Sequence, residues 1–225
     1  MEKALALDSY DIKSLSEKGL AGYDALALGS EFCARLLPAP GETQALRAVF
    51  KGRLILATPM LTEADLSDVK KLLKLLAGKK TQLEVIVNDL GLLEVLRSGF
   101  KGKVKVSCGR ILSHRVKIMP EAYVRKFLKR YGIARFEVDE PKTIRRLAPY
   151  GLPFSWHYPF RYVTVTRFCP WEEHWAESCA HSCRGRAEPL TSIRVHKTLW
   201  LKGCAYFTRG QRPKGSASRN IFEGV

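Results

Sequence analysis

Short apolar segments with β-strand composition alternate with amphipathic segments of helical period along most of this chain. Each strand-like run is four to eight residues long and each helical run that follows buries one apolar stripe. Strand, helix, strand, helix is the pattern of a parallel α/β sheet. The strand-like segments are KALALD (3–8), YDALALG (23–29), RLILATP (53–59), LEVIVND (83–89), KVKVSCG (103–109), ARFEVDE (134–140) and YVTVTRFC (162–169), with NIFEG (220–224) as an eighth.

Eight such units predict a small (β/α)₈ barrel of the TIM type, a fold that begins at roughly 200 residues. The chain has 225 residues, so we expect one α/β barrel domain over residues 1–225. The alternative is an open, doubly wound parallel α/β sheet. Neither GxGxxG nor GxxxxGK[ST] occurs, so the sequence contains neither of the common nucleotide-phosphate-binding loops.

Several helix boundaries are visible in the sequence. A helix is expected near residues 12–20. Thr62 precedes TEADLSDVKKLLKLLAG and is expected to cap a helix there, because its hydroxyl can accept from an early helix N–H. The lysines within residues 70–80 predict a solvated basic face on that helix. A further helix is expected to begin at Pro120 and to stop at Gly132.

Polar side chains follow most of the predicted strands. In either architecture the active site lies at the carboxyl ends of the strands. Asp89 could orient a substrate hydroxyl there, or cap the helix that follows it. His157 could transfer a proton near neutral pH, or be a hydrogen-bonded structural histidine. The residues at strand ends are Asp8, Gly29 to Cys33, Thr58, Asn88, Asp89, Ser107 to Arg110, Asp139, His157 and Cys169.

The segment RFCPWEEHWAESCAHSCRGR, residues 167–186, holds three of the six cysteines of the chain. Proline suits the first position of a helix, and acidic residues suit its first turns. Pro170 followed by three glutamates therefore predicts a helix from this point. Such a helix would place Cys179 one turn before Cys183, with their Cβ atoms roughly 5–6 Å apart. The predicted stripe is Trp171, Trp175, Cys179 and Cys183, and the acids are Glu172, Glu173 and Glu177.

Three interpretations of these cysteines remain open. Cys169, Cys179 and Cys183 could join a distant fourth thiolate on an iron–sulfur cluster. They could bind zinc with His174 or His181, although paired CxxC spacings are more usual for zinc. They could also be structural residues in an aromatic core. A disulfide is not expected, because we predict a reducing, cytoplasmic location.

The location and the partners are predicted from leader, hydropathy and charge. The first residues, MEKALALDSYD, lack the pattern of a secretory signal, and no apolar run has the length of a membrane span. The net charge of +16 suits an anionic small-molecule substrate or nucleic acid. The basic run at 70–80 lacks interleaved aromatics, so we expect RNA binding to be weak, electrostatic and unspecific.

The chain resembles the collagenase-like peptidase family, and within it the UbiV-like branch. The resemblance rests on DALALGSEFCARLL, ATPMLT, EVIVNDLGLLEVL, HYPFRYVTVTRFCPW and GSASRNIFEG, and it spans nearly the whole chain. It implies a 4Fe-4S cluster held by Cys33, Cys169, Cys179 and Cys183. The gap between Cys169 and Cys179 is shorter than in that branch, and Cys108 and Cys204 have no counterpart. Cys204, in the alternating segment LWLKGCAYF, is expected to be a small apolar strand residue.

The resemblance also implies a function. It suggests an enzyme, or a subunit of one, in oxygen-independent hydroxylation or related redox chemistry, with prephenate as the type of oxygen donor. Arg167, two residues before Cys169, is the predicted carboxylate-binding residue, ahead of Arg110 and Arg161. The alternatives are an RNA-modifying or RNA-binding protein and a non-catalytic, cluster-bearing partner in a heterodimer with a related chain. The absence of GxSxG and HExxH argues against a peptidase.

Overall fold

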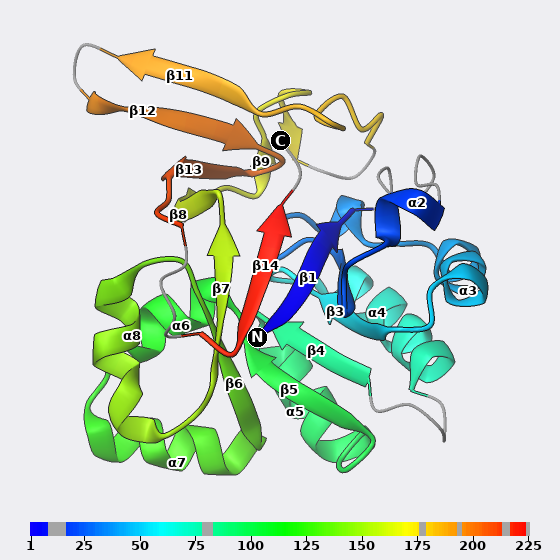
Figure 1. Cartoon of the computed structure of the whole chain (residues 1–225), viewed down its shortest axis with the longest axis vertical. Coiled ribbons are helices and arrows are strands. Elements are labelled where there is room, and N and C mark those ends of the chain that lie inside the picture. The colour runs from blue at the N-terminus through cyan, green and yellow to red at the C-terminus, as the bar shows by residue number, and fades with distance from the viewer. Residues whose placement is uncertain (9–16, 78–82, 176–178, 193–194, 213–216, 224–225) are drawn as a thin grey trace.

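Among the residues that the computed structural model describes, which are 1–8, 17–77, 83–175, 179–192, 195–212 and 217–223, eight parallel strands close into a barrel. Helices cover much of its outer side (Figure 1). This confirms the predicted (β/α)₈ barrel over the open sheet. The barrel strands, in their order around the barrel, are β1 (Glu2–Leu7), β14 (Arg219–Glu223), β7 (Phe154–Tyr158), β6 (Ile133–Val138), β5 (Val104–Cys108), β4 (Leu83–Val87), β3 (Arg53–Ala57) and β2 (Ala25–Gly29).

The helices follow the strands as the hydrophobic period predicts. Thr62 caps α4, since its hydroxyl accepts from the backbone N–H of Asp65. Gly132 ends α7 in the left-handed conformation. Both predicted boundaries are confirmed, whereas residues 12–16 of the first predicted helix lie outside the described ranges. The helices are α2 (Glu17–Leu20), α3 (Pro40–Val49), α4 (Glu63–Leu76), α5 (Leu90–Gly99), α6 (Arg110–Val116), α7 (Glu121–Tyr131) and α8 (Pro141–Leu147), with 3₁₀ turns η1 (Ala34–Leu36) and η2 (Ala148–Tyr150).

The predicted seventh barrel strand is wrong. YVTVTRFC does not enter the barrel, and its first part forms β8 (Phe160–Val165) in a separate antiparallel sheet. The barrel position belongs instead to β7, which pairs with β6 and β14. Valine and threonine favour any strand, so composition alone does not separate a barrel strand from a strand of a neighbouring sheet.

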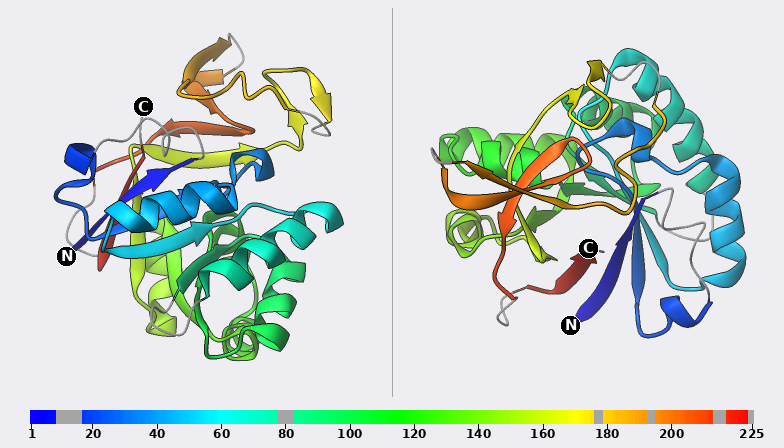
Figure 2. Two further views of the ribbon diagram at one scale, coloured as in Figure 1. Left: turned by 90° about the vertical axis from the view of Figure 1, so that its right-hand side faces the viewer. Right: turned by 90° about the horizontal axis from the view of Figure 1, so that it is seen from above.

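A segment of about sixty residues is inserted between β7 and β14 and covers the mouth of the barrel. Within its described part, an antiparallel sheet has the order β11–β12–β13–β8, and a short hairpin joins β9 to β10. Viewed from above, this sheet crosses the carboxyl end of the barrel (Figure 2). Phe160 and Phe207 of the sheet pack with Phe32 of the loop after β2 and with Ile111 of α6. The strands are β9 (Phe168–Cys169), β10 (His174–Trp175), β11 (Glu188–Ser192), β12 (Val195–Lys202) and β13 (Ala205–Arg209).

The interior of the barrel is part apolar and part charged. Small and branched side chains form one buried cluster, which consists of Ala4, Ala25, Ala27, Ile55, Ala57, Ile86 and Ile221. Near the amino ends of the strands, the fully buried Arg219 pairs with Glu84 through both carboxylate oxygens, at 2.7 and 2.6 Å. Its Nε also donates to Glu2 at 2.8 Å. In the described ranges, no helix is long and apolar enough to cross a membrane.

Candidate functional site

The loop after β2 carries the first residues of the site across the barrel mouth. Gly29 begins it with φ of +91°, and a Cβ there would lie 2.7 Å from the carbonyl oxygen of Ala57. Only glycine combines that backbone conformation with so close an approach. The turn directs Glu31 into the barrel and leaves Cys33 near the rim, where it precedes η1.

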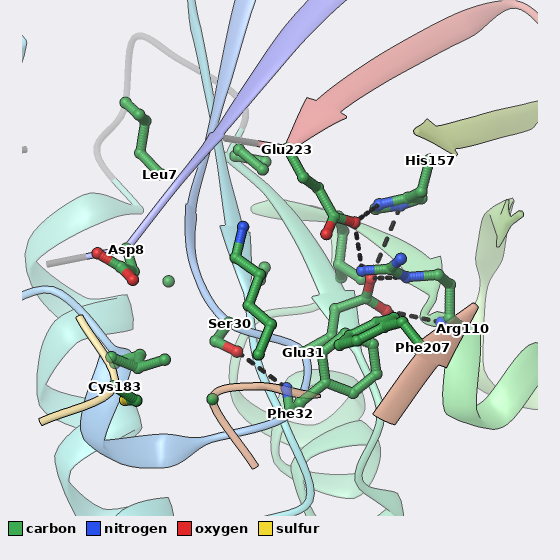
Figure 3. A pocket seen from close by; sticks show the side chains of 18 of the residues that line it. Leu7, Asp8, Ser30, Glu31, Phe32, Arg110, His157, Cys183, Phe207 and Glu223 are labelled. Atoms are coloured by element: carbon green, nitrogen blue, oxygen red, sulfur yellow. Dashed lines mark hydrogen bonds and ion pairs between the residues drawn. The ribbon is translucent and has the colours of Figure 1, made fainter. Parts of the chain in front are cut away.

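Glu31 is the centre of a buried charged network. It accepts from the Arg110 backbone N–H and from Arg110 Nε, both at 2.7 Å. Arg110 Nη2 lies 2.7 Å from Glu223. His157 places Nε2 2.9 Å from Glu137 and Nδ1 3.3 Å from Glu223. Figure 3 shows Glu31, Arg110, His157 and Glu223 pointing toward one another on one side of a pocket.

Asn88 and Asp89 hold the loops around this network. Asn88 donates to Glu31 at 3.1 Å and accepts from the Ile111 backbone N–H at 2.9 Å. A side chain on Gly109 would overlap the Asn88 amide, with contacts near 2.4 Å, so a larger residue there would displace the amide from its hydrogen bonds. Asp89 caps α5 by accepting from the Leu92 N–H at 2.9 Å. The structure therefore supports the capping interpretation of Asp89.

The carboxylates determine the protonation state of His157. Burial and the nearby Arg110 both oppose a second proton, but Glu31, Glu137 and Glu223 outweigh them and raise the pKa of His157 to about 9. Despite burial, Arg110 and His157 hold the pKa of Glu223 near 2. At neutral pH the ring carries both protons and donates to the carboxylates. This agrees with the structural interpretation of His157 and removes the basis for proton acceptance near pH 7.

Stability should fall in alkaline solution because of His157. Its pKa is higher in the folded than in the unfolded chain, where it is about 6.5, so the stabilising contribution is complete below about pH 6.5. It is lost as the pH rises through about 9. This contribution can be measured by thermal unfolding of the wild type and of His157→Gln from pH 6 to pH 10 in the presence of a reductant. The two Tm curves should converge as the pH rises; parallel curves would contradict the assignment.

The first part of the cysteine-rich segment, residues 168–175, is a hairpin rather than the predicted helix. Cys169 ends β9, its carbonyl accepts from the Glu173 N–H, and β10 then returns antiparallel with His174 opposite Cys169. Glu173 has φ of +53°, which a helix cannot contain. The stripe Trp171, Trp175, Cys179 and Cys183 is therefore not formed, and Glu177 lies outside the described residues.

Glu172 explains why the helix is not formed. Its carboxylate accepts from the backbone N–H groups of Ala180 and Ser182, each at 2.9 Å, and from the Ser182 hydroxyl at 3.0 Å. His174 Nε2 lies 2.9 Å away. These hydrogen bonds, first the one from the Ser182 backbone, lower the pKa of Glu172. A carboxylate suited to a helix start instead anchors the loop that carries Cys179 and Cys183.

Five cysteine side chains of the described residues gather at the barrel rim. The thiols of Cys33 and Cys204 are hydrogen-bonded, and this contact lowers the pKa of Cys33 to about 7. Burial, and then the charges of Cys33, Cys179 and Cys169, raise the pKa of Cys183 to about 12. The hydrogen bond to Cys33, then burial, and then the charges of Cys33, Cys169 and Cys183 raise the pKa of Cys204. We refer to Cys33, Cys169, Cys179, Cys183 and Cys204 as the thiol group.

Of the two cysteines outside the predicted ligand set, Cys204 belongs to the thiol group and Cys108 does not. The sequence predicts Cys204 as a small apolar strand residue, but it lies in the turn between β12 and β13 and contacts Cys33. The left-handed turn at Gly203, with φ of +54°, brings it there. Cys108 is fully buried in the main core. Burial raises its pKa to about 12, which leaves it a small apolar side chain outside the thiol group.

The thiol group is not a ready site for one metal ion. Within the described ranges, no three His, Cys, Asp or Glu side chains are placed to hold a single ion. The zinc interpretation thus gains no support. In a four-iron cluster each thiolate binds a different iron, so its sulfurs stand farther apart than the ligands of one ion. The number of thiols, their common location and their mutual electrostatic effect fit such a cluster.

Two pockets flank the thiol group. The first, inside the mouth, has a volume of about 80 Å³ and is lined by Cys183, Glu31, Arg110, His157 and Glu223. It has room for only a few water molecules. Cys183 and Asp8 lie across it from the charged network (Figure 3).

The second pocket has a volume of about 590 Å³, within the usual range for a small-molecule site. Cys33 and Cys204 line it together with Arg167. The structure thus brings Arg167 to the thiol group, whereas His157 belongs to the first pocket and Asp89 to neither. We refer to this cavity as the Arg167 pocket.

Sequence reasoning missed the charged residues inside the strands. Glu84, Glu137, Arg219 and Glu223 occupy alternate positions in apolar strands and point into the barrel. A strand of a parallel barrel is buried on both faces, so a charge within LEVIV, ARFEV or RNIFE requires a buried partner. That rule would have identified all four as members of interior ion pairs.

Fold and site together define a (β/α)₈ barrel protein with a thiol-rich site at the carboxyl ends of its strands. Comparison with protein-family models, with curated proteins and with solved structures gives no match. The resemblance to the collagenase-like peptidase family, and the cluster and reaction that it implies, therefore stay predictions.

Proposed function

We propose that this chain is an iron–sulfur protein, an enzyme or a subunit of one, that binds an anionic molecule beside a 4Fe-4S cluster. The observation that carries the proposal is that the five cysteines of the thiol group lie close enough to affect one another's ionisation, and that two of them, Cys33 and Cys204, line the Arg167 pocket. The thiols come from the loop after β2, from β9, from the described part of the segment between β10 and β11, and from the β12–β13 turn. Distant segments that converge on one kind of side chain indicate a shared ligand.

The electrostatics of the thiol group suit a cluster. Burial first, and then nearby negative charges that include those of neighbouring thiolates, raise the pKa values of Cys179 and Cys183. Metal binding replaces the protons and neutralises this repulsion. Cys33, Cys169, Cys179 and Cys183 would hold the cluster, which when bound accepts and donates single electrons. Cys204, hydrogen-bonded to Cys33, would orient that ligand from outside the coordination sphere.

The Arg167 pocket suits an anion with an apolar body. Phe32, Met60 and Trp175 supply apolar walls, and the Trp175 side chain is largely exposed. Arg35 lines the pocket but is paired with Asp65. Arg167 is exposed and has no ion-pair partner in the described part of the chain. Its planar guanidinium can bind a carboxylate through two hydrogen bonds, which supports a ligand of the prephenate type.

Anaerobic purification tests the proposal. The protein should be brown and contain about four irons per chain. Prephenate should change the visible spectrum of the bound cluster, because the ligand lies beside it. Arg167→Gln should keep the iron and weaken this response about tenfold, which matches the loss of one charged hydrogen bond. Arg125→Gln, an exposed arginine of α7, is the matched control.

The outcomes separate the two halves of the proposal. Stoichiometric zinc without iron would contradict the cluster. Full iron content with an unchanged prephenate response in Arg167→Gln would contradict the role of the Arg167 pocket and leave the cluster standing.

A further inference from the structure

A third hollow, of about 420 Å³, lies between the antiparallel sheet and the start of α8. Three cationic side chains line it, each from a different strand: Arg161 of β8, Lys197 of β12 and Arg209 of β13. None of them lines the Arg167 pocket or the first pocket. We refer to this hollow as the sheet pocket.

Two of the three cations are already held in position. The Arg209 guanidinium lies 4.1 Å from the centre of the Trp200 ring and 5.1 Å from that of Phe160. Stacking of this kind fixes the plane of an arginine and leaves its N–H edge available. Arg161 is held through Nε, which donates to the Thr208 hydroxyl at 3.1 Å. A site ordered before binding loses less conformational entropy when the ligand arrives.

The acidic residues of the sheet pocket do not cancel its positive charge. Glu140 is engaged by Lys117 at 2.7 Å and lies 3.8 Å from Arg161. Asp139 is buried and accepts from the Tyr162 backbone N–H at 2.7 Å. Lys197 and Arg209 are exposed and have no ion pair within the described residues. The open face of the hollow therefore carries excess positive charge.

We infer that the sheet pocket binds a phosphate group of a small phosphorylated molecule. One guanidinium can donate two hydrogen bonds to a carboxylate and so pair with it fully. A tetrahedral phosphate dianion, in contrast, can accept hydrogen bonds from three cations that approach from different directions. Thr198 and Gln211, which carry a hydroxyl and an amide, also line the hollow. The concave shape and the volume suit a small molecule rather than an extended polymer. The inference does not depend on the cluster.

Titration calorimetry of the full-length protein with inorganic pyrophosphate tests the inference. We expect saturable binding of one pyrophosphate per chain at constant ionic strength. Arg209→Gln and Lys197→Gln should each weaken it about tenfold, the loss expected for one charge-assisted hydrogen bond. Lys197 is exposed and at the surface, so its replacement cannot be confused with unfolding. Lys129→Gln removes the same charge from the exposed face of α7 and should change nothing.

Three results would overturn the inference. One is absence of pyrophosphate binding by the wild type. Another is equal binding by wild type, Lys197→Gln and Arg209→Gln. The third is tight binding of single-stranded RNA with no measurable affinity for pyrophosphate, which would replace a small-molecule site by a backbone-binding surface. Iron content should be the same in all of these variants, so failure here leaves the proposed function untouched.

Discussion

Alanine at Cys169 or Cys183 should remove most of the iron from anaerobically purified protein. The same loss is expected for Cys33→Ala and Cys179→Ala, because three thiolates leave one iron without a protein ligand and the cluster labile. Cys169 and Cys183 are buried at the barrel rim, where solvent cannot easily supply a substitute ligand. Iron per chain and visible absorbance, measured for each variant beside the wild type, give the result directly.

The two remaining cysteines are the controls. Cys108→Ala should keep the iron and cost on the order of 1 kcal/mol of packing, because Cys108 lies in the core, outside the thiol group. Cys204→Ala should also keep the iron but release it faster to a chelator, since Cys33 loses its hydrogen bond. If Cys204→Ala bleaches the protein and Cys33→Ala does not, Cys204 is the ligand and the assignment from resemblance is wrong.

Arg219→Met should lower the free energy of unfolding by about 3–5 kcal/mol, the usual cost of removing one partner from a buried ion pair. Arg219 is fully buried and satisfies both carboxylate oxygens of Glu84. Methionine fills similar space but leaves Glu84 with Ser107 at 2.6 Å and Arg135 at 3.6 Å as its remaining partners. Urea unfolding of metal-free, reduced protein measures the change.

A double variant distinguishes lost charge pairing from lost packing. Arg219→Met combined with Glu84→Gln removes both charges and should recover part of the stability. Lys71→Met breaks an exposed pair with Asp68, in which both side chains are 71% exposed, and should leave the stability nearly unchanged. Equal losses in Arg219→Met and in the double variant would show that packing, not charge, dominates at this position.

The barrel and its helices could be predicted because local and tertiary preferences agree there. In α4, the Thr62 cap, the apolar stripe and the acidic first turn all favour one helix, and the structure contains it. In α7, Gly132 stops the helix where its left-handed conformation is needed. The conformation of such residues depends on neighbours within one or two helical turns, so it can be predicted from the sequence.

The inserted segment could not be predicted because tertiary contacts decide it. Pro170 and the glutamates after it favour a helix locally, but Glu172 gains several hydrogen bonds from a loop up to ten residues away. The seventh strand failed for a related reason, since β7 and β8 are adjacent in sequence and only pairing assigns them to different sheets. Cys204 joined the thiol group through a turn that the alternating pattern concealed.

The order in which the barrel closes has a consequence for biosynthesis. β14 pairs with both β1 and β7, and its Arg219 meets Glu2, 217 residues earlier in the sequence. A chain that leaves the ribosome amino end first exposes the unpaired edges of β1 and β7 until β14 emerges. Such distant pairing is slow and leaves sheet edges open to aggregation. Chaperones should therefore engage the nascent chain late, until the emergence of β14 closes the barrel.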